Sequence, residues 1–394
     1  MVISDHPHPQ DRPGAPAADF RIRLHDRVLA DLARRLDATR WPESFDEPES
    51  WATGTDRGYL QGLVEYWRTG FDWRAQEDGL NAWPQFSIEI AGARVHFVHV
   101  RGKGPRPLPI VLTHGWPSSF MEMLRLIPLL TDPARHGADP GDSFDVVVPS
   151  VPGYAFSSRP NGPVTADSVA AAWVQLMSAL GHDRFAAHGG DIGSGITTAL
   201  GRHYPDRLVG IHLLAVRDPD VAPGDPLRPE EEAYLRSRAE WREREGAYSH
   251  LQRTKPQTLA YALHDSPVGL AAWLVEKFRA WSDCGGRVET CFTKDWLLST
   301  ITLYWATETI HSSIRYYAEG AATDRPEARV DLPTAVALFP RDLLRPPRCW
   351  AERLYNVQRW TEMPRGGHFA AHEQPELLAA DLRAFFGPLR GRDR

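Results

Sequence analysis

The stretch that decides the fold is Ala187-His188-Gly189-Gly190-Asp191-Ile192-Gly193-Ser194-Gly195. It follows a short apolar run at 185–187 and precedes a predicted helix at 196–203. Glycines on both sides of one carboxylate predict a tight, strained turn that joins a strand to a helix and holds Asp191 at its tip. The alternative is an ordinary glycine-rich turn in which Asp191 only caps the helix.

Short apolar runs surround this turn along the middle of the chain, and helical stretches separate them. The runs lie at 108–112, 144–148, 185–187 and 208–216, with helical stretches at 121–130 and 169–180. Strands without polar alternation, interleaved with helices, predict a mostly parallel sheet covered on both faces, as in α/β proteins. The strand signal returns at 334–338 and 357–361.

A different composition fills the segment between these two groups of strands. Prolines after Asp218 lead into a charged run at 230–245, and helical character continues to about Glu319. We interpret the charged run as the solvated face of a helix. The segment is therefore expected to be a mostly helical insertion that interrupts the α/β core.

The N-terminal part carries helices and one hairpin. Residues 1–20 look like a loose leader, and Asp26 is expected to cap a helix with apolar residues at 28, 29, 32 and 36 that stops at Trp41. A second amphipathic helix covers 60–67, and 86–100 predicts a hairpin. The apolar helix faces must pack on something larger, for which the α/β core is the candidate. The expected divisions are 1–105 (N-terminal region), 106–217 (first part of the core), 218–330 (cap) and 331–394 (second part of the core).

Composition excludes several classes of protein. The chain has 45 basic and 51 acidic residues among 394, a net charge of −6, which argues against nucleic acid as a partner. No apolar run approaches the roughly 18 residues that a membrane span needs. The cysteines show neither a disulfide framework nor metal-ligand spacing, so we expect a cytoplasmic enzyme without a metal. These cysteines are Cys284, Cys291 and Cys349.

The strand–turn–helix around Asp191 is the setting of the nucleophile in α/β-hydrolases, with Asp where Ser is more common. In that fold, the loop after an earlier strand donates one backbone N–H to the oxyanion, and the residue after the nucleophile donates the other. These donors would be Trp116, in Thr113-His114-Gly115-Trp116-Pro117, and Ile192. The alternative for the first loop is a turn with a buried Trp.

A candidate base and two candidate acids follow later in the chain. His368 lies in the glycine-flanked loop Arg365-Gly366-Gly367-His368-Phe369, which suits a general base, although a structural loop histidine is the alternative. Asp342, after the strand at 334–338, is our choice for the acid that orients it, and Asp218 is the competitor. The order nucleophile, acid, histidine matches the α/β-hydrolase order.

Residues from about 19 to 386 resemble the microsomal-type epoxide hydrolases and their soluble bacterial relatives. The resemblance rests on many ordered stretches along nearly the whole chain. They are Arg40-Trp41-Pro42, Tyr66-Trp67-Arg68, His114-Gly115-Trp116-Pro117, Pro149-Ser150-Val151-Pro152-Gly153-Tyr154, Gly189-Gly190-Asp191, Thr254-Lys255-Pro256, Asp265-Ser266-Pro267-Val268-Gly269-Leu270, Leu303-Tyr304-Trp305 and Arg365-Gly366-Gly367-His368-Phe369.

The resemblance implies an α/β-hydrolase fold with a helical cap, an N-terminal region that wraps the core, and a triad completed by Asp342, where many relatives carry Glu. It also implies two cap tyrosines, Tyr248 and Tyr317, that donate hydrogen bonds to the epoxide oxygen, with Tyr316 leaving the register open. Many relatives have Trp where this chain has Ile192. No cofactor is implied.

The expected activity is therefore the conversion of a small-molecule epoxide to a vicinal diol through an aspartyl ester, in natural-product biosynthesis or detoxification. Two alternatives stay open. A haloalkane dehalogenase would use the same Asp and His, with cap donors, often Trp, that cradle halide; the chain has 14 Trp. A non-catalytic α/β-hydrolase relative would be a binding protein. No membrane is expected as a partner, and the sequence leaves the oligomeric state open, with a homodimer as one candidate.

Overall fold

The computed structural model describes residues 17–391 except 46, 223 and 322–327. Within this part of the chain, nine strands form one mixed sheet in the order β1-β2-β3-β5-β4-β6-β7-β8-β9. Strands β5 to β9 of this order are parallel, and the β1–β2–β3 edge is antiparallel. The strands are β1 (Ala18–Asp19), β2 (Gln85–Ile90), β3 (Ala93–Val100), β4 (Leu108–Thr113), β5 (Phe144–Pro149), β6 (Phe185–Gly189), β7 (Leu208–Leu213), β8 (Val330–Leu338) and β9 (Tyr355–Glu362).

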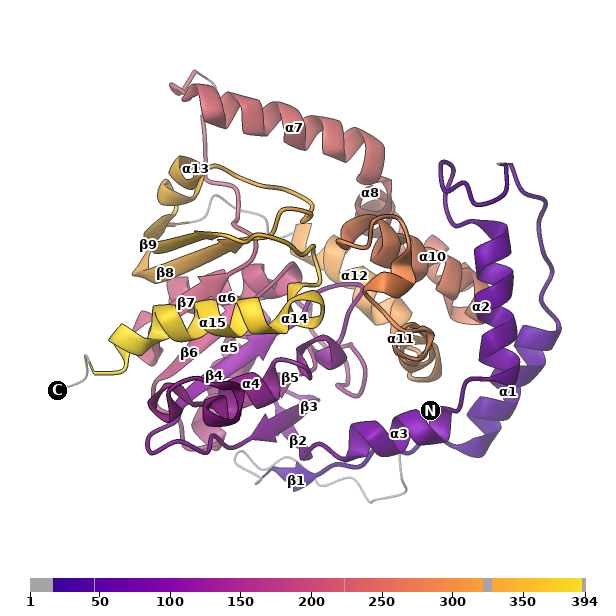
Figure 1. Cartoon of the computed structure of the whole chain (residues 1–394), viewed down its shortest axis with the longest axis horizontal. Coiled ribbons are helices and arrows are strands. Elements are labelled where there is room, and N and C mark those ends of the chain that lie inside the picture. The colour runs from indigo at the N-terminus through magenta and orange to yellow at the C-terminus, as the bar shows by residue number, and fades with distance from the viewer. Residues whose placement is uncertain (1–16, 46, 223, 322–327, 392–394) are drawn as a thin grey trace.

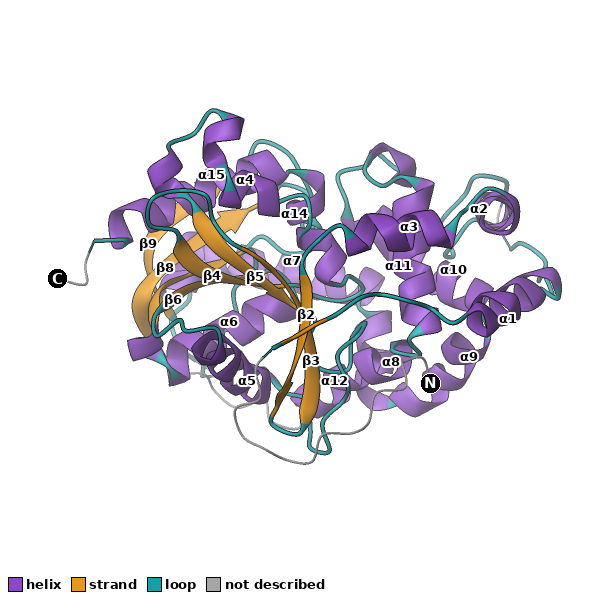
Figure 2. Cartoon of the chain, turned by 90° about the horizontal axis from the view of Figure 1, so that it is seen from below, coloured by secondary structure: helices purple, strands orange, loops and turns teal. Residues whose placement is uncertain are grey.

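The central strands are buried on both faces, as their unbroken apolar runs predicted. Every residue of β5, β6 and β7 is buried. Helices α5 (Ala166–Ala179) and α6 (Ile192–His203) cover one face, and α4 (Ile127–Thr131) and α15 (Pro375–Phe386) cover the other (Figure 2). The mostly parallel, doubly covered sheet confirms the predicted α/β class.

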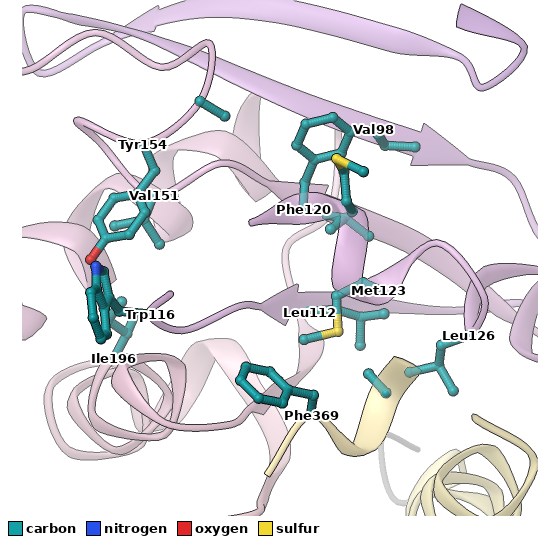
Figure 3. Close-up of a cluster of buried hydrophobic side chains, with 14 of the residues drawn as sticks. Val98, Leu112, Trp116, Phe120, Met123, Leu126, Val151, Tyr154, Ile196 and Phe369 are labelled. Atoms are coloured by element: carbon teal, nitrogen blue, oxygen red, sulfur yellow. The ribbon is translucent and has the colours of Figure 1, made fainter. Parts of the chain in front are cut away.

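The helical stretch expected at 121–130 is two pieces. A 3₁₀ helix, η1 (Phe120–Met123), precedes α4, which begins with Pro128 in its first turn. Proline is suited to a first helical turn because its missing N–H needs no partner there. Figure 3 shows Phe120 and Met123 of η1 among the buried side chains that include Leu112 and Phe369. This packing fixes η1 against the end of β4.

Among the residues described between β7 and β8, six α-helices lie within the expected 218–330 segment. Helices α8 and α9 pack on α12, and α10 packs on α9 and α11. They sit to one side of the sheet's carboxyl edge (Figure 1). They are α7 (Pro229–Glu245), α8 (Ala247–Thr254), α9 (Pro256–Asp265), α10 (Pro267–Trp281), α11 (Lys294–Ala306) and α12 (Ile310–Ala321); α13 (Arg348–Glu352) and α14 (Ala370–Glu373) belong to the core.

The charged run forms helix α7 with a largely solvated surface, as interpreted from the sequence, but two of its side chains are buried. Glu231 is 1% exposed and accepts two hydrogen bonds from Arg353, at 2.6 and 2.8 Å. Tyr234 is buried beside Trp350 of α13, with ring centroids 5.6 Å apart. The composition of α7 does not reveal these contacts, because only the side chains of Glu231 and Tyr234 attach the helix to the core.

The N-terminal helices pack on the cap, and not on the α/β core that the sequence favoured. Helix α1 (Asp26–Asp37) contacts α10, α2 (Arg57–Thr69) contacts α10 and α11, and α3 (Trp73–Asn81) contacts α11 (Figure 1). Trp67 donates its indole N–H to the hydroxyl of Thr302 at 3.1 Å. Among the described N-terminal residues, strands β1, β2 and β3 join the core sheet. The apolar cap helices provide the surface on which the N-terminal helices pack. The periodic spacing of apolar residues shows that these helix faces are buried, but not against which surface.

Smaller sequence expectations about this region also change. His25, and not Asp26, caps α1, since its side chain accepts from the amide of Arg27, and the helix ends at Asp37, before Trp41. Of the expected loose leader 1–20, residues 1–16 lie outside the described residues. Ala18 and Asp19 pair with β2 as strand β1.

Candidate active site

Asp191 sits at a strained turn between β6 and α6. Its backbone has φ 50°, a value in the left-handed region that residues other than glycine rarely adopt. A Cβ atom at Gly189 would lie 2.1 Å from the carbonyl oxygen of Gly193, and one at Gly193 would lie 2.1 Å from that of Thr113. The glycines are therefore required for the helix to start so close behind the strands, which leaves the aspartate at the tip.

Asp191 precedes α6 but its side chain does not cap that helix. Its Oδ1 instead accepts the backbone N–H of Trp116 at 2.8 Å. The backbone of Ile192 also hydrogen-bonds the carboxylate. A Cβ at Gly115 would come within 2.4 Å of the Cβ of Asp191, so this loop needs glycine to approach. The two expected oxyanion donors thus lie at one carboxylate.

His368 bridges two carboxylates from different elements. Its Nδ1 lies 2.7 Å from Oδ1 of Asp342, and its Nε2 lies 3.6 Å from Oδ2 of Asp191. The competing acid, Asp218, pairs instead with Arg238 of α7. The backbone N–H of His368 donates to the carbonyl of Trp281 at 2.8 Å, which attaches the histidine loop to the cap.

The electrostatics of this group favour an ion pair. Burial alone would raise the pKa of Asp191, but His368 and the amides of Trp116 and Ile192 outweigh it and hold the pKa below its usual range. Burial alone would lower the pKa of His368, but Asp342 and Asp191 raise it well above the ordinary value. Both shifts favour a protonated His368 beside an ionised Asp191 in the resting state.

Two tyrosines of the cap lie close enough to Asp191 for its charge to act on both phenols. The ring of Tyr248, on α8, stacks on Trp116 with centroids 5.4 Å apart and planes 7° apart. Tyr317, on α12, meets Tyr248 edge-on at 6.1 Å. Burial and the charge of Asp191 raise the pKa of both phenols, so both are neutral O–H donors at pH 7. Tyr316, the alternative to Tyr317, contributes instead to raising the pKa of Tyr154.

A small cavity lies beside Asp191, with about 10 Å³ of space for the centre of a water molecule. Its walls combine residues of the β4 loop, η1, the Asp191 turn and the histidine loop. They are Gly115, Trp116, Ser118, Glu122, Met123, Gly190, Asp191, His368 and Phe369.

Three residues of the site were not singled out from the sequence. Glu122 is buried in the cavity wall, Tyr304 donates its hydroxyl to the carbonyl of Ser118 at 2.6 Å, and Trp281 lies 5.3 Å from His368, centroid to centroid. An acidic residue within the apolar stretch 121–130 was a usable signal for Glu122. The other two are aromatic residues in long apolar helices, which sequence patterns assign to the core.

One cluster outside the site has metal-ligand side chains. His99, Asp145 and His182 bring three donor atoms within 4.8 Å of one another. However, Asp145 accepts from the guanidinium of Arg101 at 2.7 Å and lies 3.2 Å from Nε2 of His99. The cationic Arg101 already balances this carboxylate, so an ion-pair network accounts for the cluster.

The comparisons with known proteins agree with the site's geometry. Residues 17–123 match the family model described as epoxide hydrolase N terminus, and residues 109–257 match that of the alpha/beta hydrolase fold. A Stigmatella aurantiaca protein, whose name places it provisionally among the epoxide hydrolases, is 46% identical over 95% of this chain and 85% of its own. Epoxide hydrolase 1 of Sus scrofa is 38% identical over 97% and 92%. The chain belongs to the epoxide hydrolase family.

Solved structures of the family have the same architecture. The Aspergillus niger epoxide hydrolase superposes with a TM-score of 0.84 at 31% identity, over 95% of this chain and 97% of that one. The juvenile hormone epoxide hydrolase of Bombyx mori gives 0.87 at 29% identity, over 95% of each chain. The α/β-hydrolase fold expected from the sequence is confirmed. Among the described helices of this family member, none is both long and apolar enough to cross a bilayer.

Proposed function

We propose that this epoxide hydrolase family member opens a small-molecule epoxide to a vicinal diol through an ester on Asp191. The observation that carries the proposal is the arrangement around one carboxylate. Oδ1 accepts the Trp116 amide at 2.8 Å, while Oδ2 lies 3.6 Å from Nε2 of His368. One oxygen is thus held by a backbone donor, and we assign the other as the attacking atom, with a base beside it.

The first step joins the nucleophile to the substrate. Oδ2 of Asp191 attacks one ring carbon, the bond from that carbon to the epoxide oxygen breaks, and the oxygen takes a proton from Tyr248 or Tyr317. A carboxylate needs no prior deprotonation, but the alkoxide is a poor leaving group that needs an acid. The buried, neutral phenols of the pair support this role.

The second step returns the enzyme to its starting state. Water attacks the carbonyl carbon of the ester, His368 takes one of its protons, and the amides of Trp116 and Ile192 hold the oxyanion. The acyl–oxygen bond then breaks and the diol leaves with the former Oδ2, so an oxygen from water stays in Asp191. The departing alkoxide takes the remaining proton of the water-derived hydroxyl, so the diol leaves with Asp191 again a carboxylate and His368 again protonated.

Ester formation itself prepares the base. The charge of Asp191 raises the pKa of His368 in the resting enzyme. When that carboxylate becomes a neutral ester, this contribution is lost and the pKa of His368 falls. The imidazolium then gives its proton to the phenolate left by the first step, which restores the neutral phenol, and the neutral imidazole can accept a proton from water.

One observation favours haloalkane dehalogenation as a second candidate. Displacing a halide needs N–H donors around the leaving group, and the indole nitrogens of Trp116 and Trp281 are buried without a hydrogen-bond partner. The test is a screen of the purified protein on styrene-type, alkyl and polycyclic epoxides beside matched bromoalkanes. Diol from epoxides without bromide release supports the epoxide reaction, and bromide release alone supports the alternative. A binding protein would yield neither product.

Compartment and assembly are part of the proposal. Three free thiols, those of Cys284, Cys291 and Cys349, support a reducing compartment such as the cytoplasm. A homodimer, the assembly that the sequence leaves as a candidate, would double the chain mass of 44.3 kDa, which light scattering of the purified protein measures directly.

A further inference from the structure

A buried carboxyl group that the two steps above do not use lines the cavity beside the triad. Glu122 lies on the 3₁₀ helix η1 and is 6% exposed. The same cavity is lined by Asp191 and His368. The two neighbours of Glu122 in the chain, Met121 and Met123, are 5% and 1% exposed. The glutamate is therefore held inside the protein on a fixed backbone.

An ionised carboxyl group is costly to bury unless something compensates. Burial raises the pKa of Glu122 to about 7, with the hydroxyl of Ser118 and the charge of His368 acting in the opposite direction and Asp191 and Glu373 adding to the rise. No arginine or lysine pairs with it among the contacts that the described residues make with this side chain. Packing alone would be better served by an apolar or amide side chain of similar size.

The cavity has the size and polarity of a water site. The centre of a water molecule can occupy about 10 Å³ of it, which is close to the roughly 10–15 Å³ that one buried water needs and far below the volume of a typical small-molecule pocket. A buried water needs two to four polar partners. Glu122, His368 and Ser118 supply such partners around the carboxyl carbon that becomes the ester.

We propose that Glu122 holds, together with His368, the water molecule that attacks the aspartyl ester. This inference rests on the proposed function, because it concerns the second step of the same reaction. One O–H of the water points at Nε2 of His368, which takes that proton as the water oxygen bonds to the ester carbon. The other O–H donates to the carboxylate of Glu122, which fixes the direction of attack and gains no proton. Ester formation in the first step involves no water and does not need Glu122.

The experiment compares the two steps in Glu122→Gln, which keeps the shape of the side chain and removes the carboxylate. Enzyme in excess over styrene oxide is sampled by rapid quench, and intact-protein mass spectrometry follows the ester as it forms and decays. We expect ester formation within about twofold of wild type and ester decay slower by about 10- to 100-fold, the loss typical of a misplaced reactant. Glu122→Asp, which retains a carboxylate, should restore part of the decay rate.

Glu231→Gln is the matched control, because it changes another buried glutamate, 1% exposed, outside the cavity. It is expected to lower the Tm without changing the ratio of the two rates. Equal slowing of both steps in Glu122→Gln, or ester decay at the wild-type rate, overturns the proposal. If Glu122→Gln yields no folded protein, Glu122→Asp decides: it must slow ester decay alone, and a wild-type rate overturns the proposal. Absence of any ester in wild type would instead refute the proposed function.

Discussion

The backbone N–H of Trp116 lies 2.8 Å from Oδ1 of Asp191, so the donor that we propose for the oxyanion already contacts this carboxylate in the structure. The contact depends on Gly115, whose missing Cβ lets the loop approach the aspartate. A donor fixed in this way needs no reorganisation when charge develops on that oxygen in the second step. The same hydrogen bond also favours ionised Asp191 in the resting enzyme.

Asp191→Ala removes the group that would form the ester. Diol formation should fall by more than about 10⁴-fold, because a lost nucleophile cannot be replaced by its neighbours. The Tm should stay near that of wild type, since no hydrogen bond of the sheet is lost. Alanine is preferred to asparagine, which the site could hydrolyse back to aspartate. Substantial diol from the alanine variant would contradict the assignment.

His368→Gln should separate the two steps. The ring can still open, because the tyrosines supply the proton, but no base remains to activate water. The intact protein should gain the mass of one substrate molecule, and the modified peptide should contain Asp191. Continued turnover with no adduct would show that His368 is not the base.

The orienting acid is tested by comparing Asp342→Asn with Asp218→Asn. Asp342 contacts Nδ1 of His368 and raises its pKa, whereas Asp218 pairs with Arg238. Asp342→Asn should lower the maximal rate of ester hydrolysis and move the rising limb of its pH profile to lower pH, because the folded-state pKa of His368 falls. Asp218→Asn should leave the profile in place. A shift in the second variant alone would reverse the assignment.

The tyrosine pair separates epoxide opening from halide displacement. Loss of one oxyanion-type donor typically costs about 10²–10³ in rate, and a shared role should make Tyr248→Phe and Tyr317→Phe each milder than that. The double variant should lose far more ester formation than either single one, with ester hydrolysis largely kept. Tyr316→Phe is the matched control and should form ester at the wild-type rate. Single-turnover ester formation measures all four, and a double variant as fast as wild type would disprove the role.

The core and the triad could be predicted from the sequence because each depends on local signals. Apolar runs identified the buried strands, and the glycines around Asp191 and His368 marked turns that only small residues allow. Asp342 was chosen as the orienting acid because it follows the end of a strand, and its contact with His368 agrees with that choice. These features are decided within a few residues of each position.

Contacts between distant elements could not be predicted in this way. The apolar faces of α1 and α2 indicate burial but not a partner, and the structure packs them on the cap. Glu231 looks like any other charge in a polar helix until Arg353 of the core is beside it. Glu122 is likewise a single acid in an apolar stretch, and only the folded chain brings it to the cavity of Asp191.

The most direct test of the account follows an oxygen atom through one turnover. Excess enzyme opens styrene oxide in water enriched in ¹⁸O, and both the diol and the peptide containing Asp191 are analysed by mass spectrometry. A covalent ester hydrolysed at its carbonyl predicts an unlabelled diol and a peptide heavier by one ¹⁸O, because the diol takes the former Oδ2. A labelled diol with an unlabelled peptide would mean that water attacks the epoxide directly, and would contradict Asp191 as the nucleophile.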